Sequence, residues 1–566
     1  NIAMLLEKNE RDEEMDEEND IDVKTAIVPV PSVLPRIIRL PDVSEANSRH
    51  CFVFLEDMLM FYAARFFVGY DLLEARAFRI TRDADLYIDE EDAQDLVVEV
   101  ERQLKKRQRG QAVRLEFEVG TSRFMRRFMT QEMNLEKEDM YQIDGPLDMT
   151  VFFGFCGIKG YDHLRYPEAH PHSPWSMLEL KRTPETNIFD MIREKDLLIH
   201  LPYESFDESV VNFLYSAAND KDVLAIKQTL YRVSSSSPVV QALEKAVQNG
   251  KQVTVLMEVK ARFDEANNIL MARRLEKAGA HVIYGLVGLK THSKCTLVIR
   301  REKDGIRRYV HVATGNYNAS TAKLYTDLGI LTCSDRFGID ASAFFNLLSG
   351  YSDPPIWDSF IVAPINLRQR CIELIDREIH FAKNGEDAHM IAKMNSLLDK
   401  GIIEKLYEAS QAGVKIELIV RGICVLIPGI PGVSDNITVR SIVGRFLEHS
   451  RIFWFRNGGR EELYISSADW MPRNLNDRVE LMVPIEDPEI KRRLKQMVDI
   501  ELSDNQKAHI MQADGTWLKT ISAENQLCAQ EYFQKIAEKR DAEDEMTLAQ
   551  KLEPYTPVLG HGDGSD

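Results

Sequence analysis

The fold is decided by two matching stretches, Ala242-Leu-Glu-Lys-Ala-Val-Gln-Asn-Gly-Lys-Gln-Val-Thr-Val-Leu256 and Lys405-Leu-Tyr-Glu-Ala-Ser-Gln-Ala-Gly-Val-Lys-Ile-Glu-Leu-Ile419. Each has a helical apolar pattern that ends at a glycine, Gly250 or Gly413, and each continues into an apolar strand. A unit of this kind belongs to a parallel or mixed sheet that helices cover on both faces. We therefore predict an α/β fold that contains a tandem duplication.

The chain around the first copy continues the alternation of strands and helices. The predicted strands are Val223–Leu230, Val253–Val259, His281–Tyr284, and Thr296–Ile299 with Tyr309–Val312 around an Asp304-Gly305 turn; the predicted helices are Val239–Asn249 and Ala266–Ala278. We predict four domains, with boundaries at 1–178 (an α+β head), 179–359 and 360–515 (the two α/β copies), and 516–566 (a helical segment and a flexible tail).

The head region has mixed patterns. Predicted strands Ile2–Leu6 and Thr25–Val30 flank an acidic loop at Glu10–Asp22, and Val113–Val119 alternates as a half-buried strand does. Helical periodicity is present in Ser48–Phe67 and Glu90–Lys106. At the other end, the tail from about residue 515 is predicted to begin as a helix and to finish disordered.

Composition limits the class of protein. The chain has 566 residues and a net charge of −19, which argues against a protein that coats nucleic acid. Its seven cysteines contain no Cys-x-x-Cys pair, which fits reduced cytosolic thiols and no structural zinc. No apolar stretch is long enough to cross a membrane, so we expect a cytoplasmic protein and leave peripheral membrane association open. The chain starts at Asn1, without a methionine or a basic stretch, so we read it as a fragment.

Two copies of a second pattern carry the chemistry. His292-Ser-Lys294 is followed by Ala313-Thr-Gly-Asn316, and His449-Ser-Arg451 is followed by Ser466-Ser-Ala-Asp469. One His-x-Lys tripeptide is expected by chance, and an isolated histidine at a strand edge is usually structural. Two copies, each with a turn of small residues, indicate one active site between two related domains.

These residue types suit phosphoryl transfer at a histidine. A neutral imidazole nitrogen is a competent nucleophile near pH 7. Lys294 and Arg451 would stabilise the charge that develops on phosphate oxygens, and Asn316 with its neighbouring hydroxyls would orient those oxygens. The second histidine can donate a proton or a hydrogen bond to the leaving oxygen.

This arrangement resembles the phospholipase D superfamily, which has His-x-Lys followed by a Gly/Ser-x-Asn turn in each of two domains. The second copy departs from that pattern, because Arg451 replaces the lysine and Asp469 replaces the asparagine.

Further motifs resemble the polyphosphate kinases of the first type. They are Ala225-Ile-Lys-Gln-Thr-Leu-Tyr-Arg-Val233, Ala261-Arg-Phe-Asp-Glu265, Gly288-Leu-Lys-Thr-His-Ser-Lys294, Thr314-Gly-Asn-Tyr-Asn318, Thr321-Ala-Lys-Leu-Tyr-Thr-Asp327, Val420-Arg-Gly-Ile-Cys424 and Ser466-Ser-Ala-Asp-Trp-Met471. The resemblance implies tandem phospholipase D-like α/β domains after an α+β head domain. The family's N-terminal helical domain has no counterpart in this sequence.

The resemblance also implies an activity and its partners. The γ-phosphate of ATP would pass to His292, forming phosphohistidine, and then to inorganic polyphosphate, and the reverse reaction would make ATP from ADP. His449 would face His292 as acid/base and phosphate contact. Mg²⁺ would be required, no nucleic acid would take part, and the protein would be a homo-oligomer, either a dimer or a tetramer.

Four further residues match family positions. Tyr325 and Arg421 match nucleotide-binding positions, and Arg232 and Arg262 match positions that the family associates with the Mg²⁺-phosphate site. An arginine has no lone pair to offer a metal, so we expect the last two to bind the phosphates that hold the ion. His311 also matches a family histidine, but its place in a strand fits structural support equally well.

Simpler readings stay open at this stage. In one such reading, Arg262 only forms a surface ion pair with Asp264 or Glu265. In another, Tyr325 is only a core residue of the helix after the turn. No clear ligand spacing joins His163, His170 and His172. No P-loop motif is present.

Two other functions are also open. One is a phospholipase D-like phosphodiesterase, which Arg451 and Asp469 argue against. The other is a non-catalytic scaffold that binds polyphosphate or nucleotide, whose signature would be binding without phosphate transfer.

Overall fold

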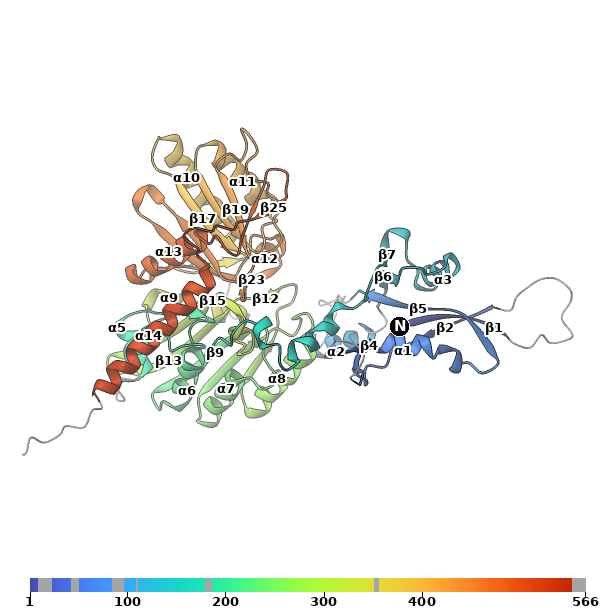
Figure 1. The fold of residues 1–566 in the computed structure, drawn as a ribbon. Helices are drawn as coiled ribbons and strands as arrows, with labels where there is room; N and C mark the ends of the chain where they lie inside the picture. The colour runs from blue at the N-terminus through green and yellow to red at the C-terminus, as the bar shows by residue number, and fades with distance from the viewer. Residues whose placement is uncertain are drawn as a thin grey trace, which may run out of the picture. The chain divides into compact units, whose positions relative to one another are not determined.

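The computed structural model describes residues 1–8, 23–41, 50–83, 96–107, 110–178, 186–350 and 356–551, and these form two compact units (Figure 1). Unit 1 comprises Asn1–Ile88 and Glu101–Pro167, and unit 2 comprises Asp89–Val100 and Glu168–Asp566. The predicted acidic loop Glu10–Asp22 and the end of the tail, residues 552–566, lie outside the described residues.

Unit 1 contains a five-stranded sheet in the order β2-β1-β5-β6-β7. Its strands are β1 (Ile2–Lys8), β2 (Val23–Val28), β5 (Tyr70–Arg82), β6 (Ala112–Glu118) and β7 (Met140–Ile143). Only β6 and β7 pair in parallel. Phe78, Leu115 and Phe117 of the sheet form an apolar cluster with Met125 and Met129 of helix α3 (Arg123–Met133). The predicted strands of this region are confirmed.

One helix prediction in unit 1 is wrong over part of its length. In the predicted helix Ser48–Phe67, residues Phe52–Phe54 form strand β4, which pairs with β3 (Ile37–Arg39). Among the described residues of this range, 50–67, only α1 (Leu55–Phe61) and a 3₁₀ turn, Ala63–Arg65, are helical. The aromatic and β-branched side chains of Phe52–Phe54 favour a strand when a partner strand is available. The second predicted helix is α2 (Leu96–Arg107).

The first sheet of unit 2 has the order β11-β10-β9-β13-β14-β15-β20, and β8 pairs with β15. Its strands are β8 (Leu197–Leu201), β9 (Val223–Leu230), β10 (Gln252–Met257), β11 (His281–Tyr284), β13 (Cys295–Glu302), β14 (Gly305–Ala313), β15 (Tyr325–Thr332) and β20 (Leu447–Glu448). Its helices are α5 (Ile188–Glu194), α6 (Asn212–Asn219), α7 (Pro238–Gln248), α8 (Glu265–Ala278) and α9 (Asp335–Leu348).

The second sheet has the order β12-β23-β22-β21-β17-β18-β19-β24-β25, and β16 pairs with β23. Its strands are β12 (Lys290–Thr291), β16 (Ile361–Ala363), β17 (His389–Met394), β18 (Lys415–Val420), β19 (Ile437–Ile442), β21 (Arg451–Phe455), β22 (Glu462–Ser466), β23 (Arg478–Pro484), β24 (Ala508–Met511) and β25 (Trp517–Lys519). Its helices are α10 (Leu367–Lys383), α11 (Lys400–Gln411), α12 (Pro472–Asn476) and α13 (Pro488–Leu502).

The two sheets repeat one topology, which confirms the predicted duplication of a mixed α/β unit. The order β11-β10-β9-β13-β14-β15 corresponds strand for strand to β19-β18-β17-β21-β22-β23. Three of the six strands in each set are parallel neighbours, and the rest are antiparallel. The matching stretches of sequence form α7 with β10 and α11 with β18. Helix α8 has no counterpart between β18 and β19, all of whose residues the structure describes.

Each half also lends a short strand to the other. β12, in the first half of the chain, pairs in parallel with β23 of the second sheet. β20, in the second half, pairs in parallel with β15 of the first sheet. One apolar core, with Leu297 and Phe344 from the first half and Ile391, Leu463 and Leu494 from the second, joins the two halves. The strands exchanged in this way end directly before His292 and His449.

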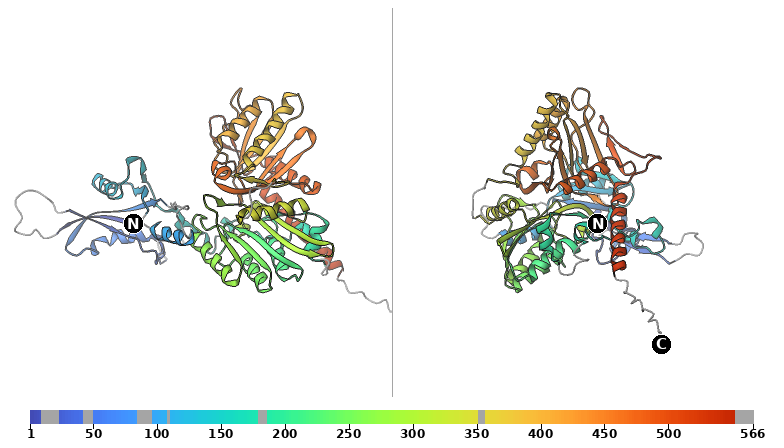
Figure 2. Two further views of the ribbon diagram at one scale, coloured as in Figure 1. Left: turned by 180° about the vertical axis from the view of Figure 1, so that it is seen from behind. Right: turned by 90° about the vertical axis from the view of Figure 1, so that its left-hand side faces the viewer.

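The C-terminal part differs from its prediction. The segment that was predicted to begin as a helix first forms strand β25, which pairs with β24, and the helix α14 starts later (Ala529–Lys551). Trp517 and Leu518 pair with the exposed edge of the sheet, and this pairing overrides their local pattern. Figures 1 and 2 show α14 running beside the first α/β half, and Phe533 of α14 packs 5.1 Å from the ring of His200 there.

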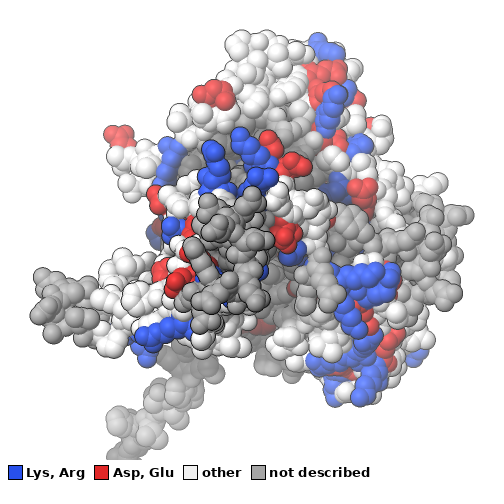
Figure 3. Space-filling view, turned by 90° about the vertical axis from the view of Figure 1, so that its right-hand side faces the viewer, with Lys and Arg blue, Asp and Glu red and all other residues white. Residues whose placement is uncertain are grey.

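The surface carries both signs of charge. Figure 3 shows one face, on which groups of Lys and Arg side chains are interspersed with Asp and Glu. The net charge of −19 is therefore compatible with local basic regions. Among the described residues, no helix combines the length and the hydropathy needed to cross a bilayer.

Candidate active site

His292 is held by a carboxylate of the other half of the duplication. Its Nδ1 lies 2.9 Å from both carboxylate oxygens of Glu480, a fully buried residue of β23. The parallel pairing of β12 with β23 places these two side chains together, because Thr291 is in register with Val479. With Nδ1 engaged, Nε2 is the ring nitrogen left for chemistry, and it has no hydrogen-bond partner among the described residues.

His449 has the equivalent arrangement, with the histidine from the second half and the carboxylate from the first. Its Nδ1 lies 2.8 and 2.9 Å from the two oxygens of Asp327, a buried residue of β15. Here the pairing of β20 with β15 brings the residues together, because Thr326 is in register with Glu448. Each histidine is therefore oriented by a carboxylate from the opposite half.

The hydroxyls of the two turns bind these carboxylates. Thr314 Oγ1 donates to Asp327 at 2.6 Å, and Ser467 Oγ donates to Glu480 at 2.5 Å. At Gly315 an added β-carbon would collide with the Asp327 carboxylate, so only glycine permits this approach. The prediction that the turn hydroxyls orient phosphate is thus wrong for Thr314 and Ser467, whose protons are used within the protein.

The cation after each histidine is buried. Lys294 is 2% exposed, contacts the backbone oxygen of His292 through Nζ, and lies 5.4 Å above the ring of Tyr231. Arg451 is 3% exposed and binds Asp469 with two hydrogen bonds, from Nε at 3.1 Å and from Nη2 at 3.0 Å. The two departures from the family pattern thus form one bidentate ion pair.

Arg451 also reaches the ring of His449. Its Nη1 lies 3.2 Å from Nε2 of that ring and donates to the backbone oxygen of His449 at 2.7 Å. The ring of Tyr325 lies 5.3 Å from the same imidazole. His449 is therefore enclosed by a carboxylate, a guanidinium and an aromatic ring.

Burial and nearby cations set the protonation of the site. Burial, and then the positive charges of Lys294, Arg478 and Arg451, hold the pKa of His292 well below its usual value of 6.5. Burial lowers the pKa of Lys294 to about 7, against the opposing effect of Glu480. His292 is therefore a neutral imidazole at physiological pH, which is the form that can act as a nucleophile.

Several arginines surround the histidines. Arg478 and Arg451 are both near enough to influence the pKa of His292, and Arg478 and Arg262 influence that of Arg473. Neither Arg473 nor Arg478 has a side-chain hydrogen bond or ion pair with a described residue. Closely spaced cations without acidic partners repel one another, and a bound polyanion relieves that repulsion.

The predicted nucleotide-binding residues lie beside His449. Arg421, half-buried at the end of β18, donates to Asn395 Oδ1 from Nε at 3.1 Å and from Nη2 at 2.7 Å. Asn395 in turn donates to the backbone oxygen of His449 at 3.1 Å. Arg421 thus has partners inside the protein. Its Nη1 has no partner among the described residues.

Two other expectations concern Tyr325 and Asn316. Tyr325 begins strand β15, so the alternative reading as a core residue of a helix is wrong. The side-chain oxygen of Asn316 is buried and has no hydrogen-bond partner among the described residues. A buried polar atom without a partner is a feature that a ligand donor can satisfy.

Arg232 and Arg262 lie next to each other. Arg232 Nε is 2.7 Å from Asp264 Oδ2, and its Nη2 donates to the backbone oxygen of Arg262 at 3.0 Å. The ion pair with Asp264 is thus made by Arg232. Among the described residues, no group of three His, Cys, Asp or Glu could hold a metal ion. His163, His170 and His172 therefore do not form such a group.

His311 has a hydrogen-bond partner inside the protein. It is 2% exposed in β14, its Nδ1 lies 2.8 Å from the hydroxyl of Tyr317, and burial lowers its pKa to about 3. Its ring also contacts Gly329, where an added β-carbon would lie 2.6 Å from Nε2.

Sequence reasoning missed Glu480, Asp327, Tyr231, Arg473 and Arg478. A carboxylate inside the apolar run Val479–Val483 was the available signal for Glu480, because a buried charge needs a partner. Asp327 stands at the corresponding place in β15. Tyr231 packs edge-on against His292, with ring centroids 4.7 Å apart, and no local pattern marks it.

Taken together, the described residues form one site from both halves. It presents a neutral imidazole with a free nitrogen, a second oriented imidazole near enough to influence the pKa of the first, and buried cations around them. Such a site can accept a phosphoryl group on nitrogen and stabilise the charge on its oxygens.

Three family models match the chain. The polyphosphate kinase middle domain matches residues 1–155, the polyphosphate kinase C-terminal domain 1 matches residues 187–354, and the polyphosphate kinase C-terminal domain 2 matches residues 360–530. The second and third models correspond to the two halves of the duplication.

Curated relatives and a solved structure agree with these models. The chain is 51% identical over 511 residues to a polyphosphate kinase of Halalkalibacterium halodurans, covering 90% of this chain and 70% of the relative. It is 48% identical over 528 residues to one of Bacillus anthracis, covering 92% and 73%. The crystal structure of polyphosphate kinase from Porphyromonas gingivalis superposes with a TM-score of 0.80 at 32% identity, covering 96% of this chain and 78% of that one. This match confirms the predicted fold class.

Proposed function

Since the chain belongs to the polyphosphate kinase family, we propose that it transfers the γ-phosphate of ATP reversibly to inorganic polyphosphate through a phosphohistidine at His292. Transfer between ATP and polyphosphate is the activity of the family. The observation that supports His292 as the carrier is its Nδ1 contact with buried Glu480, which leaves Nε2 for phosphorus.

In the first step the lone pair of His292 Nε2 forms a bond to the γ-phosphorus of ATP. The bond from that phosphorus to the oxygen that bridges to the β-phosphate breaks, and ADP leaves with that electron pair. The phosphorylated ring carries positive charge while Nδ1 keeps its proton. Glu480, at 2.9 Å from Nδ1, stabilises that charge and fixes the tautomer.

In the second step a terminal oxygen of polyphosphate attacks the phosphorus on His292. The nitrogen–phosphorus bond breaks, its electron pair returns to Nε2, and the chain is one phosphate longer. A phosphoramidate is a reactive donor, so both steps can run in reverse and make ATP from ADP and polyphosphate. Covalent catalysis of this kind divides one transfer into two easier ones.

His449 faces the same phosphoryl group and acts as acid/base and phosphate contact. Its ring is oriented by Asp327, as that of His292 is by Glu480. Asp469 neutralises Arg451, whereas no carboxylate binds Lys294 directly among the described residues. The site is therefore asymmetric, and the less compensated cation stands beside the nucleophile.

The substrates are ATP or ADP and polyphosphate, all polyanions. Lys294, Arg451, Arg473 and Arg478 supply positive charge near the histidines, and phosphate oxygens prefer such charge-assisted hydrogen bonds. We assign nucleotide binding to Tyr325 and Arg421, which both lie beside His449. We assign phosphate contact to Asn316, whose side-chain Nδ2 can donate to a phosphate oxygen.

A kinase of this family needs a divalent metal, and we propose Mg²⁺. The described residues offer no cage of three ligands for it, and Arg232 and Arg262 cannot coordinate a cation. They fit phosphate instead. Mg²⁺ commonly reaches such sites on substrate phosphates, and when bound it neutralises phosphate charge. Arg232 and Arg262 would then hold those phosphates from the other side.

We also propose a cytoplasmic location and a homo-oligomeric state, dimer or tetramer. No disulfide joins any of the seven cysteines, which fits a reducing compartment. The oligomeric state follows the family resemblance and is measurable by sedimentation. Peripheral contact with a membrane is measurable by vesicle flotation.

The test of the mechanism is labelling by γ-³²P-ATP with Mg²⁺, followed by peptide mapping. An acid-labile, base-stable phosphate on His292 that polyphosphate or ADP removes is the expected result. His292→Ala should lose the label and keep the fold, and His281→Ala, which alters an exposed histidine of β11, should keep both. Label on another residue, or turnover by His292→Ala, would overturn the proposal.

A further inference from the structure

Gln530, in the first turn of α14, binds the segment that carries His449. Its Oε1 accepts from the backbone nitrogen of Phe446 at 2.9 Å, and its Nε2 donates to the backbone oxygen of Phe446 at 2.9 Å. The same Nε2 donates to Glu448 Oε1 at 2.6 Å. Gln530 is 3% exposed, and all of these groups are buried. One side chain thus fixes both ends of Phe446 and the residue before His449.

The other oxygen of Glu448 completes the link to the site. Glu448 Oε2 accepts from Thr326 Oγ1 at 2.8 Å and from Lys393 Nζ at 2.7 Å. Thr326 lies next to Asp327, the partner of the His449 ring. Thr326 Oγ1 also accepts a hydrogen bond from the backbone nitrogen of His449 at 3.2 Å. The hydrogen bonds therefore run from Gln530 through Glu448 to the backbone of His449.

The backbone at Gly444 is shaped to admit Gln530. A β-carbon at Gly444 would collide with the amide oxygen of Gln530. Helix α14 begins with a further contact, because the backbone nitrogen of Ala529 donates to Asp504 Oδ2 at 2.8 Å. The first turn of α14 is therefore fitted closely to the protein.

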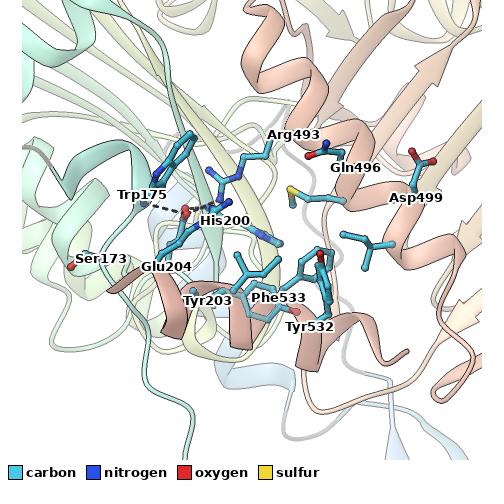
Figure 4. A pocket seen from close by; sticks show the side chains of 15 residues that line it. Ser173, Trp175, His200, Tyr203, Glu204, Arg493, Gln496, Asp499, Tyr532 and Phe533 are labelled. Atoms are coloured by element: carbon cyan, nitrogen blue, oxygen red, sulfur yellow. Dashed lines mark hydrogen bonds and ion pairs between the residues drawn. The ribbon is translucent and has the colours of Figure 1, made fainter. Parts of the chain in front are cut away.

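Beyond this turn, α14 borders a cavity. This cavity, of about 450 Å³, lies between α13 and α14. In Figure 4, Arg493 and Gln496 line it from α13, and Phe533 lines it from α14 beside Tyr203. Phe533 packs against Tyr203 at 5.5 Å, and Tyr203 packs against Phe446 at 5.6 Å. The hydroxyl of Tyr203 is buried without a partner among the described residues. Gln530 and Phe533 are thus two of the buried contacts through which α14 docks.

We propose that Gln530 is a positioning residue for His449, so that phosphoryl transfer depends on the docking of α14. This inference rests on the proposed role of His449. Gln530 touches no reacting atom. It holds Phe446 and Glu448 so that β20 keeps its register with β15 and the His449 ring meets Asp327.

Removal of the amide leaves several buried groups without partners. In Gln530→Ala the two backbone groups of Phe446 and one oxygen of Glu448 lose their hydrogen bonds, which is costly inside a protein. Local movement of β20 would relieve this cost, and it would displace His449. Gln530→Met keeps the length of the side chain and removes only the hydrogen bonds, so it is the variant for which folding is least at risk.

The experiment compares wild type, Gln530→Met, Gln530→Ala and Gln534→Ala. Gln534 lies one turn further along α14, and its hydrogen bonds, of 3.2 to 3.5 Å, go to His170, His172 and Glu538 and not to the segment of His449. It is therefore a matched control on the same helix. For each protein, kcat and KM for ATP synthesis from polyphosphate are measured, together with the NMR titration of the His449 ring.

Both Gln530 variants are expected to lower kcat by about 10-fold or more, with a smaller change in KM, because hydrogen bonds to a charged group are lost. The His449 resonance should move in Gln530→Met and stay in place in Gln534→Ala. A kcat within about threefold of wild type in a folded Gln530→Met, or an unchanged His449 titration, would overturn the inference. Lack of transfer by wild type would contradict the proposed function instead, and the His449 titration would still decide this one.

Discussion

His292 Nδ1 lies 2.9 Å from both carboxylate oxygens of Glu480, and the two residues belong to different halves of a duplicated fold. The reciprocal pair is His449 with Asp327. Each half supplies a histidine to the site and a carboxylate to the other half's histidine. Neither half alone therefore contains an oriented imidazole, which gives a physical reason why the duplication stays in one chain with one joint core.

Substitution of Glu480 tests this relationship. Glu480→Gln keeps the size of the side chain, but its amide cannot stabilise a charged imidazole. We expect kcat to fall at least about 100-fold, as when the carboxylate behind a catalytic histidine is lost. Steady-state ATP synthesis from polyphosphate measures it. Glu276→Gln, an exposed change on α8, should stay at the wild-type rate. Near-normal turnover by folded Glu480→Gln would show that the carboxylate is dispensable.

The pH dependence of kcat/KM should be set by Lys294 on the alkaline side. Burial lowers the pKa of Lys294 to about 7, so its positive charge is lost as the pH rises through that value. The pKa of His292 is held well below 6.5, so this imidazole stays neutral on mild acidification and contributes no acidic limb there. We expect kcat/KM for ATP to decline above about pH 7.

Lys294→Arg separates this cause from others. An arginine stays charged throughout, so the residual activity of the variant should lack the decline above about pH 7. The measurement is the kcat/KM profile from about pH 5.5 to about 9, with the wild type alongside. The same alkaline limb in both proteins would assign it to another group.

Removal of metal should abolish transfer without unfolding the protein. Mg²⁺ commonly reaches phosphate-transfer sites on substrate phosphates, so the ion is expected to arrive with the nucleotide. Excess EDTA should stop ATP synthesis and leave the thermal midpoint unchanged, and added Mg²⁺ should restore the rate. A drop in the midpoint on chelation would reveal a structural metal instead.

The sequence predicted most of the α/β region because its elements are locally encoded. Val223–Leu230 and His281–Tyr284 are strands with the predicted bounds, and Gly279 ends α8 in the left-handed conformation with φ of 104°. The prediction was wrong at Phe52–Phe54 and at Trp517–Lys519, which become strands only because a partner strand lies beside them.

The site was predictable in its repeated part only. The two His-x-cation motifs are visible because they occur twice along the chain. β12 and β20 are two residues long, which is too short for a periodic pattern in the sequence to reveal them. Each pairs with the sheet of the other half. Glu480 and Asp327 become partners of the histidines through that exchange. The link of Arg451 with Asp469 is likewise a tertiary contact, because it joins the first residue of β21 to the turn after β22.

That last pair gives a prediction about stability. Arg451 and Asp469 are buried and joined by two hydrogen bonds, of 3.1 and 3.0 Å. Asp469→Asn leaves the guanidinium without its counter-charge and should cost about 3 kcal/mol or more of unfolding free energy. Arg451→Lys gives up the bidentate geometry and should cost less. The double variant recreates the combination Lys294 with Asn316 of the first half, so it should be more stable than the sum of the single changes predicts.

A double-mutant cycle measures this coupling. Chemical unfolding of the wild type, Arg451→Lys, Asp469→Asn and the double variant gives the interaction energy, for which we expect at least about 1 kcal/mol. Lys495→Met with Asp499→Asn is the matched control, because that ion pair of 2.7 Å is exposed and joins residues four apart on α13. Its coupling should stay within about 0.5 kcal/mol, as for surface pairs. If the costs at Arg451 and Asp469 simply add, the two residues are independent, and the ion pair does not explain why both depart from the pattern together.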